Sequence, residues 1–273
     1  MRNLELNGRW VIVTGASSGL GREMARDLAK RHNANVILVA RRRERLQELQ
    51  IELETKYRVQ ARVICADLAK REDVDRVFSE ATSGADVQAV VLNAGITHFG
   101  HHHELSWEEF ETMLDTNVKS AVRLTHHFVP YLLGKDQGGA IMLVTSMSGL
   151  QPVPYQTAYS STKAFLTTFG LGLHHELAGK NLSITTFAPG GIATEMVENN
   201  GLGAHFGKGM QLQAAEYVAR EAVNALVQRK YLHVPGQFNR LQLFLPRFLP
   251  RRLVGTVVAS AFEKALHSRP KLS

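Results

Sequence analysis

In "WVIVTGASSGLG" (residues 10–21), an apolar run passes directly into three closely spaced glycines. The residues that follow place Met24 and Leu28 on one face of a helix, with charged residues opposite. Glycine is needed where the backbone takes a positive φ or closely approaches a pyrophosphate, and the N-terminus of a helix attracts anions. The arrangement therefore predicts a dinucleotide-binding turn made by Gly15, Ser17, Ser18, Gly19, Leu20 and Gly21.

The rest of the chain repeats this alternation of apolar runs and longer amphipathic stretches. Further runs lie at 35–41, 62–67, 89–95, 140–146 and 182–190, and a last strand is expected near 231–234. Continuous, β-branched runs are typical of strands buried on both faces of a sheet. Strand alternating with helix predicts a single doubly wound α/β Rossmann domain, with a mostly parallel seven-stranded sheet and helices on both faces.

Composition places the chain among ordinary globular proteins, because 44% of its residues are hydrophobic and 21% are charged. Cys65 is the only cysteine and no signal peptide is evident at the start, so a reducing, cytoplasmic setting is expected. The net charge of +7 would suit nucleic-acid binding. However, the arginines cluster at 40–47 and 245–253 instead of forming one basic arm, so no nucleic-acid partner is predicted.

Five motifs occur in order along the chain: "TGASSGLG" (14–21), "NAG" (93–95), Asn117, Ser146 and "YSSTK" (159–163). Together they resemble the short-chain dehydrogenases/reductases, over about residues 8–236. The resemblance implies hydride transfer with a nicotinamide cofactor and places the Rossmann domain at 1–236. Residues 237–273 are then an apolar and basic extension packed on the same domain.

The second apolar run ends "VILVARRR", so Ala40 and Arg41 stand where NAD-binding sites usually carry a carboxylate. A carboxylate would repel a 2′-phosphate, whereas guanidinium groups bind one through charge-assisted hydrogen bonds. Arg41 and Arg42 therefore favour NADP(H) as the cofactor. The alternative is a solvated arginine run that opens a helix.

The resemblance also assigns cofactor contacts further along the chain. Asp67 would meet the adenine, although its sequence context equally suits a helix cap. The remaining contacts implied by the resemblance are Leu68, Asn93, Ala94, Gly95, Pro189, Gly190, Ile192 and Thr194, besides Tyr159 and Lys163.

Tyr159 and Lys163 are one helical turn apart and can act together. A phenol of pKa about 10 needs its phenolate stabilised to work as an acid/base near neutrality, and an adjacent ammonium can do this. Ser146 is predicted to orient the substrate oxygen, with Ser148 as the competing candidate. Asn117 would hold a proton-relaying water, or alternatively bond within a helix kink.

The histidines of "HFGHHHEL" (98–105) do not form a metal-ligand pattern, so no metal is predicted. By resemblance the loop after "NAG" borders the substrate cleft. The predicted substrate pocket is therefore lined by His98, Phe99, Ser146, Tyr155 and Tyr159. The glycine-rich segment 190–211 is predicted to form a flap over the substrate.

The tail after residue 236 is rich in Leu, Phe and Arg, without an apolar run long enough to span a bilayer. Three interpretations stay open: it covers the cleft or meets another subunit, it contacts an anionic membrane peripherally, or it binds another partner. By resemblance, helices at about 106–134 and 156–178 would form the interface of a homodimer or homotetramer.

The leading functional prediction is an NADPH-dependent oxidoreductase that interconverts a carbonyl and a secondary or primary alcohol on an apolar or lipid-like small molecule. One alternative is a 3-oxoacyl thioester (ACP or CoA) reductase. Another is a non-catalytic nucleotide-sensing regulator on the same fold. Its signature would be loss of Tyr159 or Lys163, and both are present.

Overall fold

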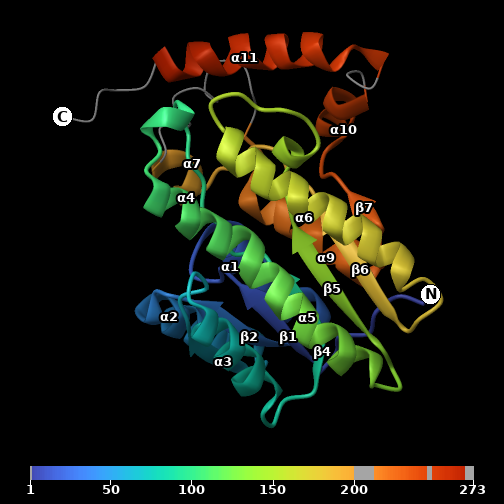
Figure 1. Ribbon diagram of the computed structural model, residues 1–273. Helices are drawn as coiled ribbons and strands as arrows, with labels where there is room; N and C mark the ends of the chain where they lie inside the picture. The colour runs from blue at the N-terminus through green and yellow to red at the C-terminus, as the bar shows by residue number, and fades with distance from the viewer. Residues whose placement is uncertain (1, 200–211, 245–247, 268–273) are drawn as a thin grey trace.

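Seven parallel strands form the centre of the computed structural model, which describes residues 2–199, 212–244 and 248–267 (Figure 1). The spatial order is β3-β2-β1-β4-β5-β6-β7. The strands are β1 (Trp10–Thr14), β2 (Asn35–Ala40), β3 (Ala61–Cys65), β4 (Val87–Leu92), β5 (Gly139–Val144), β6 (Leu182–Phe187) and β7 (Leu232–His233). The predicted α/β class, strand number and parallel pairing are confirmed.

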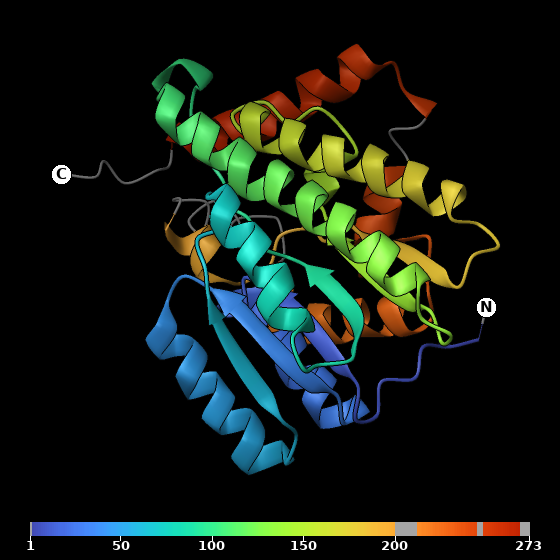
Figure 2. The same cartoon turned by 60° about the horizontal axis from the view of Figure 1, so that its bottom comes forward.

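Helices cover both faces of the sheet (Figures 1 and 2). One face packs against α1 (Gly19–His32), α2 (Arg43–Tyr57) and α9 (Ala215–Val227). The other packs against α3 (Arg71–Thr82), α5 (Ser120–Leu133) and α6 (Thr157–Glu176). Successive β1 residues show why the runs are continuously apolar, because Val11 and Val13 join the first core and Ile12 joins the second.

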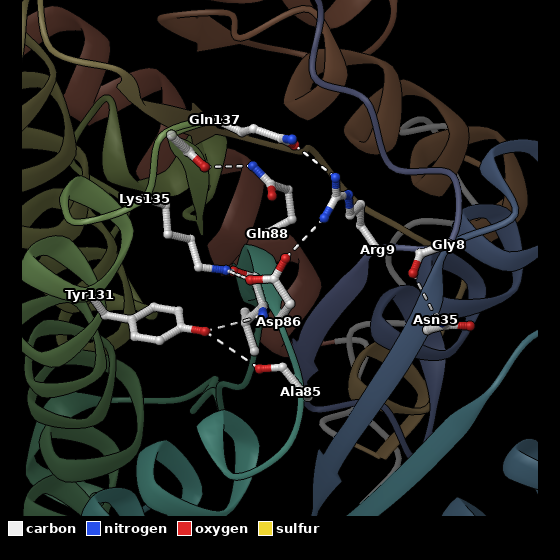
Figure 3. Close-up of polar contacts among 11 residues, drawn as sticks. Gly8, Arg9, Asn35, Ala85, Asp86, Gln88, Tyr131, Lys135 and Gln137 are labelled. Carbon is white, nitrogen blue, oxygen red and sulfur yellow. Dashed lines mark hydrogen bonds and ion pairs between the residues drawn. The ribbon is translucent and has the colours of Figure 1, made fainter.

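The strand order reverses between β1 and β4, where chain connections leave in opposite directions. Ligands bind open α/β sheets at such a point, outside the carboxyl ends of the strands. The amino-terminal edge is instead closed by polar contacts (Figure 3). There Arg9 donates to Asp86 Oδ2 and to Gln137 Oε1, each at 2.9 Å, and Lys135 also pairs with Asp86. Ligand-binding residues are therefore expected at the carboxyl edge.

The stretch before α5 is not one continuous α-helix. The short α4 (Trp107–Leu114) passes into a π-helical turn at Asp115–Lys119, and α5 then continues. Such π-turns are frequent at functional sites. Asn117 lies in this turn and its side chain is fully buried.

The segment after β7 folds back over the carboxyl ends of the strands. It contains α10 (Gln237–Phe244) and α11 (Arg251–His267), and Figure 1 shows α11 lying across the end toward which β5 points. Val254, Val258 and Phe262 recur every four residues on one face of α11. Val258 and Phe262 pack with Phe99, Val153 and Val197, the last from the short α7 (Glu195–Asn199). Most of the predicted flap at 190–211 lies outside the described residues.

Candidate active site

A cavity of about 620 Å³ lies at the carboxyl edge of the sheet. Its floor comes from the turn after β1 and the ends of β2, β4, β5 and β6, and its roof includes residues of α10 and α11. This is the size range of sites for small molecules and cofactors.

The glycine turn has the backbone that only glycines accommodate easily. Gly15 and Gly19 have φ of 70° and 51°, in the left-handed region. A Cβ at Gly21 would lie 2.3 Å from the Gly15 carbonyl oxygen, so this position excludes any side chain. Ser17, Ser18 and Leu20 line the cavity from the same turn. Gly15 and Gly19 also line the cavity, but Gly21, which was predicted to contact the cofactor, does not. Glycine is required at this position by the close packing of α1 on the Gly15 backbone.

Arg41 and Arg42 line the cavity just beyond Ala40, the last residue of β2. The Arg42 guanidinium donates to Ser17 Oγ at 3.0 and 3.2 Å and to Ser18 Oγ at 2.6 Å. The second strand is thus followed directly by two arginines, with no carboxylate at its end, and the guanidinium of Arg42 is held by two serine hydroxyls. Donors of this kind suit a phosphate monoester.

The remaining predicted cofactor contacts also meet at the cavity. The Thr14 hydroxyl accepts from the Asn93 and Ala94 amides at 2.9 and 3.0 Å, and Asn93 Nδ2 donates to Thr14 O at 2.9 Å. These bonds tie the end of β4 to β1. The other lining residues that were predicted are Asp67, Leu68, Gly95, Pro189, Gly190, Ile192 and Thr194.

Asp67 does not cap the helix that follows it. Its carboxylate accepts from the Ala69 amide at 3.2 Å, and α3 starts only at Arg71, after Lys70. The carboxyl group closes a local turn at the cavity wall instead. This finding rules out the alternative interpretation of Asp67 as a helix cap.

Ser146, from the loop after β5, and Tyr159, from α6, come together on the cavity wall. Ser146 Oγ accepts from the Ser148 amide at 3.1 Å, which fixes the orientation of its hydroxyl. Burial raises the pKa of the Tyr159 phenol, and a hydrogen bond with Ser146 lowers it in part. The pair can therefore act on one oxygen placed between them.

Lys163 lies behind Tyr159, with its side chain almost wholly buried. Its ammonium donates to the Val144 carbonyl at 2.9 Å and lies 5.8 Å from the centroid of the Tyr159 ring. Burial lowers the pKa of Lys163 to about 8. Burial is the largest influence on the pKa of Tyr159, although its side chain is only partly buried and lines the cavity. The role of Lys163 in lowering that pKa stays a prediction.

Asn117 is engaged on every polar atom of its side chain. Its Oδ1 accepts from the Ile96 amide at 2.8 Å, and its Nδ2 donates to Ile96 O at 2.9 Å and to Thr162 Oγ1 at 3.1 Å. The side chain thus fastens the π-turn to the loop after β4 and to α6. Asn117 does not itself line the cavity, although its neighbour Thr116 does. The role of Asn117 in holding a proton-relaying water stays a prediction.

The family model of short chain dehydrogenases matches residues 9–204, most of the chain and all of the site except its roof. This chain belongs to the short-chain dehydrogenase family. The resemblance inferred from the five motifs is thereby confirmed.

The sequence identity to three individual proteins of known activity lies between 24% and 32%. The very-long-chain 3-oxoacyl-CoA reductase of Anas platyrhynchos is 32% identical over 193 residues, 69% of this chain and 61% of that protein. L-Sorbose reductase from Gluconobacter frateurii, solved with NADPH and L-sorbose, is 26% identical with a TM-score of 0.76, covering 85% of this chain and 96% of that one. A 7β-hydroxysteroid dehydrogenase structure, 24% identical, shares the fold with a TM-score of 0.84, covering 95% and 100%. The chain spans 57% to 62% of the length of several curated vertebrate relatives.

The substrate end of this short-chain dehydrogenase differs from the sequence prediction. His98, Phe99 and Tyr155 are not among the residues that line the cavity. Phe99 turns inward and packs against Phe262, with their ring centroids 6.1 Å apart. The reason is that α11 offers an apolar face, which buries Phe99 under the roof.

The substrate end of the cavity is lined by residues other than those predicted in the loop after β4. The lining at this end includes Gln151, Val153, Gln156 and the α10–α11 residues Phe238, Gln242, Leu249, Val254, Val257, Val258, Ala261 and Phe262. The four-residue apolar spacing in α11 was the signal that could have identified part of this roof. Among the described residues, no three His, Cys, Asp or Glu side chains gather as metal ligands.

Proposed function

We propose that this short-chain dehydrogenase is an NADP(H)-dependent oxidoreductase that interconverts a carbonyl and a secondary or primary alcohol. The observation that carries the proposal is the grouping of Ser146, Tyr159 and buried Lys163 at the same cavity as the glycine turn. A non-catalytic nucleotide sensor would not need this acid/base set.

The residues around the cavity fit a dinucleotide with a 2′-phosphate. Gly15 and Gly19 line the cavity with left-handed backbone, and Arg41 and Arg42 supply cations at the end of β2. When bound, NADPH supplies the hydride in the reductive direction. Lys163 and Thr194 would hold the nicotinamide half. Asp67 would meet the adenine, and Asn93 would lie on the ribose and adenine side.

The protein's own part in the reaction is proton transfer and orientation. Ser146 donates a hydrogen bond to the substrate oxygen, and Tyr159 donates its phenolic proton to the same oxygen. The Tyr159 phenol is protonated at neutral pH and can act as the acid, while burial raises its pKa and so disfavours the phenolate that forms. The positive charge of Lys163 behind the ring would offset this cost.

The substrate is proposed to be apolar or lipid-like, since the roof of the cavity is built from apolar side chains. Val254, Val258 and Phe262 are buried or partly buried there, and Val153 faces them from the other wall. Gln151, Gln156 and Gln242 are polar groups on the same lining. Such a site would take a molecule with a bulky apolar body and few hydrogen-bonding groups.

A 3-oxoacyl thioester is the second candidate substrate. The very-long-chain 3-oxoacyl-CoA reductase is among the relatives that this chain resembles, which favours a long acyl chain. The apolar roof is compatible with such a chain as well as with a compact polycyclic ketone.

We also propose that the exposed side of the tail contacts an anionic membrane. Residues 237–273 hold seven of the 32 Lys and Arg and only one of the 25 Asp and Glu. Large apolar side chains outside the cavity lining are exposed on the same segment, including Leu241, Phe244 and Phe248 at 53%, 52% and 73%. Basic charge beside exposed apolar groups is typical of interfacial binding. No helix in the described part of the chain is long and apolar enough to cross a membrane.

A homodimer or homotetramer through α4, α5 and α6 is proposed on the basis of the family and of one surface feature. Phe165 on α6 is 50% exposed and stacks on Phe169, with ring centroids 6.3 Å apart. Exposed stacked aromatics are enriched at protein interfaces. Light scattering of the purified protein tests this proposal, and a monomer at micromolar concentration would contradict it.

The function itself is tested by measuring NADPH oxidation with a panel of carbonyl compounds. The panel holds small ketones and aldehydes, bulky polycyclic ketones, and 3-oxoacyl-CoA and 3-oxoacyl-ACP of several chain lengths, each with NADPH and NADH. We expect activity on a bulky or long-chain member, with NADPH preferred. Equal kcat/KM for the two cofactors would contradict the assignment of Arg41 and Arg42. NADPH binding without turnover of any member would favour the sensor alternative.

A further inference from the structure

Glu195 lies between two arginines at the cofactor end of the cavity. Its Oε2 accepts from Arg42 Nη1 at 2.9 Å, and its Oε1 accepts from Arg45 Nη1 at 2.5 Å. Glu195 and Arg42 both line the cavity. Arg42 therefore divides its donors between this carboxylate and the hydroxyls of Ser17 and Ser18.

The Glu195 carboxylate is an anion at neutral pH. Hydrogen bonds from Arg42 and then Arg45 hold the pKa of this carboxyl below its usual range. It thus already has the charge sign and the oxygen geometry that these guanidinium groups would recognise in a phosphate. A phosphate monoester carries about −1.5 to −2 charges at pH 7 and would repel a carboxylate at the same place.

Glu195 also connects the two ends of the cavity, because it is the first residue of α7. Thr194 before it lies close to the turn, since a Cβ at Gly19 would meet Thr194 Cγ2 at 3.1 Å. Met196 and Val197 after it line the cavity, and Val197 packs with Phe99 and Phe262 under α11. Whatever displaces Glu195 acts on a segment that reaches the roof.

We propose that Glu195 is an internal competitor of the cofactor's 2′-phosphate for Arg42. This inference rests on the proposed NADP(H) dependence. NADPH must break or share the Glu195–Arg42 ion pair to gain the full guanidinium, whereas NADH carries no 2′-phosphate and leaves the pair intact. Glu195 therefore reduces the ratio of the affinity for NADPH to the affinity for NADH. When the 2′-phosphate binds, it also breaks the ion pair that holds the start of α7 to Arg42.

The size of the effect follows from the exposure of the pair. Both side chains are 42% exposed, so the Glu195–Arg42 bond is screened and is worth at most about 1 kcal/mol. Removing it should tighten NADPH binding by about two- to fivefold, because a factor of ten corresponds to about 1.4 kcal/mol.

Glu195→Gln tests the proposal, because it keeps the shape of the side chain and removes its charge. Dissociation constants of NADPH and NADH are measured by calorimetry for the full chain. We expect the Kd of NADPH to fall by the stated factor and that of NADH to change by less than the same experiment's error. A weaker NADPH complex would show instead that Glu195 organises Arg42, and equal shifts for both cofactors would indicate a general structural effect. Either result overturns the proposal.

Two further variants separate competition from general electrostatics. Glu44→Gln removes a charge from an exposed residue of the same helix as Arg45 and should leave both dissociation constants unchanged. In the Arg42→Gln background, Glu195→Gln should no longer tighten NADPH binding, since the contested guanidinium is gone. An undiminished effect there would contradict the proposal.

Failure of the proposed NADP(H) dependence and failure of the competition by Glu195 give different binding results. If the wild-type protein binds neither cofactor, the proposed function is wrong. If it binds NADPH and Glu195→Gln binds it with the same affinity, the function stands and only the competition is wrong.

Discussion

Burial controls the titration of the two residues that carry the proposed proton transfer. The phenol of Tyr159 and the ammonium of Lys163 are both shielded from water, which raises the pKa of the first and lowers that of the second to about 8. Both shifts favour the neutral form of the group. Formation of the Tyr159 phenolate therefore depends on compensating positive charge close to the ring.

The shift at Lys163 predicts a specific dependence of stability on pH. In the unfolded chain a lysine has a pKa of about 10.4. Between about pH 8 and pH 10.4 the unfolded state therefore binds more protons at this residue than the folded state, so its contribution to stability rises with pH. Lys163→Met should remove that rise.

Thermal unfolding of wild type and Lys163→Met between pH 7 and about pH 9.5 measures this effect. The free energy of unfolding of the variant, relative to that of the wild type, should be highest at the lower pH. This difference should decrease as pH increases. The lost bond to Val144 O shifts the variant equally at every pH, so it does not mask the trend. Parallel stability curves would show that Lys163 titrates normally.

A second residue-scale prediction distinguishes Ser146 from Ser148. Ser146→Ala should lower kcat by about 10²- to 10³-fold, because an oriented donor to the reacting oxygen is lost. Ser148→Ala is the matched control. Its amide, not its hydroxyl, donates to Ser146 Oγ, so kcat should change by only a few-fold. Equal losses for the two variants, measured as NADPH oxidation, would contradict the assignment.

Single residues were predictable where chemistry demands a particular type at a particular spacing. The spacing of Ser146, Tyr159 and Lys163 placed all three at one cavity. The environment of those groups was not predictable, because the direction of a pKa shift depends on burial that only the packed structure defines. Phe99 shows the same limit, since its burial depends on Phe262, 163 positions later in the chain.

At the scale of elements, the glycine turn joins β1 to α1 through a backbone contact that is too close to admit a side chain. Gly21→Ala would bring a Cβ to 2.3 Å from the Gly15 carbonyl oxygen, which is backbone and cannot move aside cheaply. We expect a lower melting temperature together with loss of NADPH binding.

Gly172→Ala provides the matched control for that variant. It lies within α6, and a Cβ there would meet nothing within 4 Å. Alanine is the better helix former by about 1 kcal/mol, so this variant should be slightly more stable and fully active. Equal effects of the two variants in thermal unfolding and calorimetry would refute the role of the turn.

Elements were predictable from periodicity, but their ends were not. The run "AVVLNAG" (89–95) reads as one apolar segment, yet β4 stops at Leu92 because Asn93 and Ala94 turn to bond Thr14. The helix expected at 106–134 is likewise divided by the π-turn that holds Asn117. Both departures occur where side chains bond to distant parts of the chain near the site. Such long-range contacts cannot be predicted from the local sequence pattern.

At the scale of the whole molecule, the segment after β7 forms one wall of the proposed substrate pocket. The family model ends at residue 204, whereas α10 and α11 lie beyond it and supply the roof. One side of α11 packs with Phe99 and Val153, and other residues of α10 and α11 remain exposed. The same segment therefore serves the proposed apolar pocket and the proposed membrane contact.

Membrane contact predicts that exposed residues of this segment control sedimentation with vesicles. Phe248→Ser should weaken binding to vesicles containing phosphatidylserine, because a 73% exposed aromatic group is lost from the surface. Ile51→Ser, which removes a 61% exposed apolar group from α2, is the control and should have no effect. Binding that is absent in the wild type, or equally strong to neutral vesicles, would contradict the proposal.

The central claim is that the chain reduces a carbonyl with Tyr159 as the acid. The most direct measurement compares wild type and Tyr159→Phe in two readouts, the turnover of the best carbonyl substrate and the Kd of NADPH. The account predicts that turnover falls by at least about 10²-fold, since general acid catalysis is lost, while the Kd changes little. Turnover in Tyr159→Phe close to that of the wild type would contradict it.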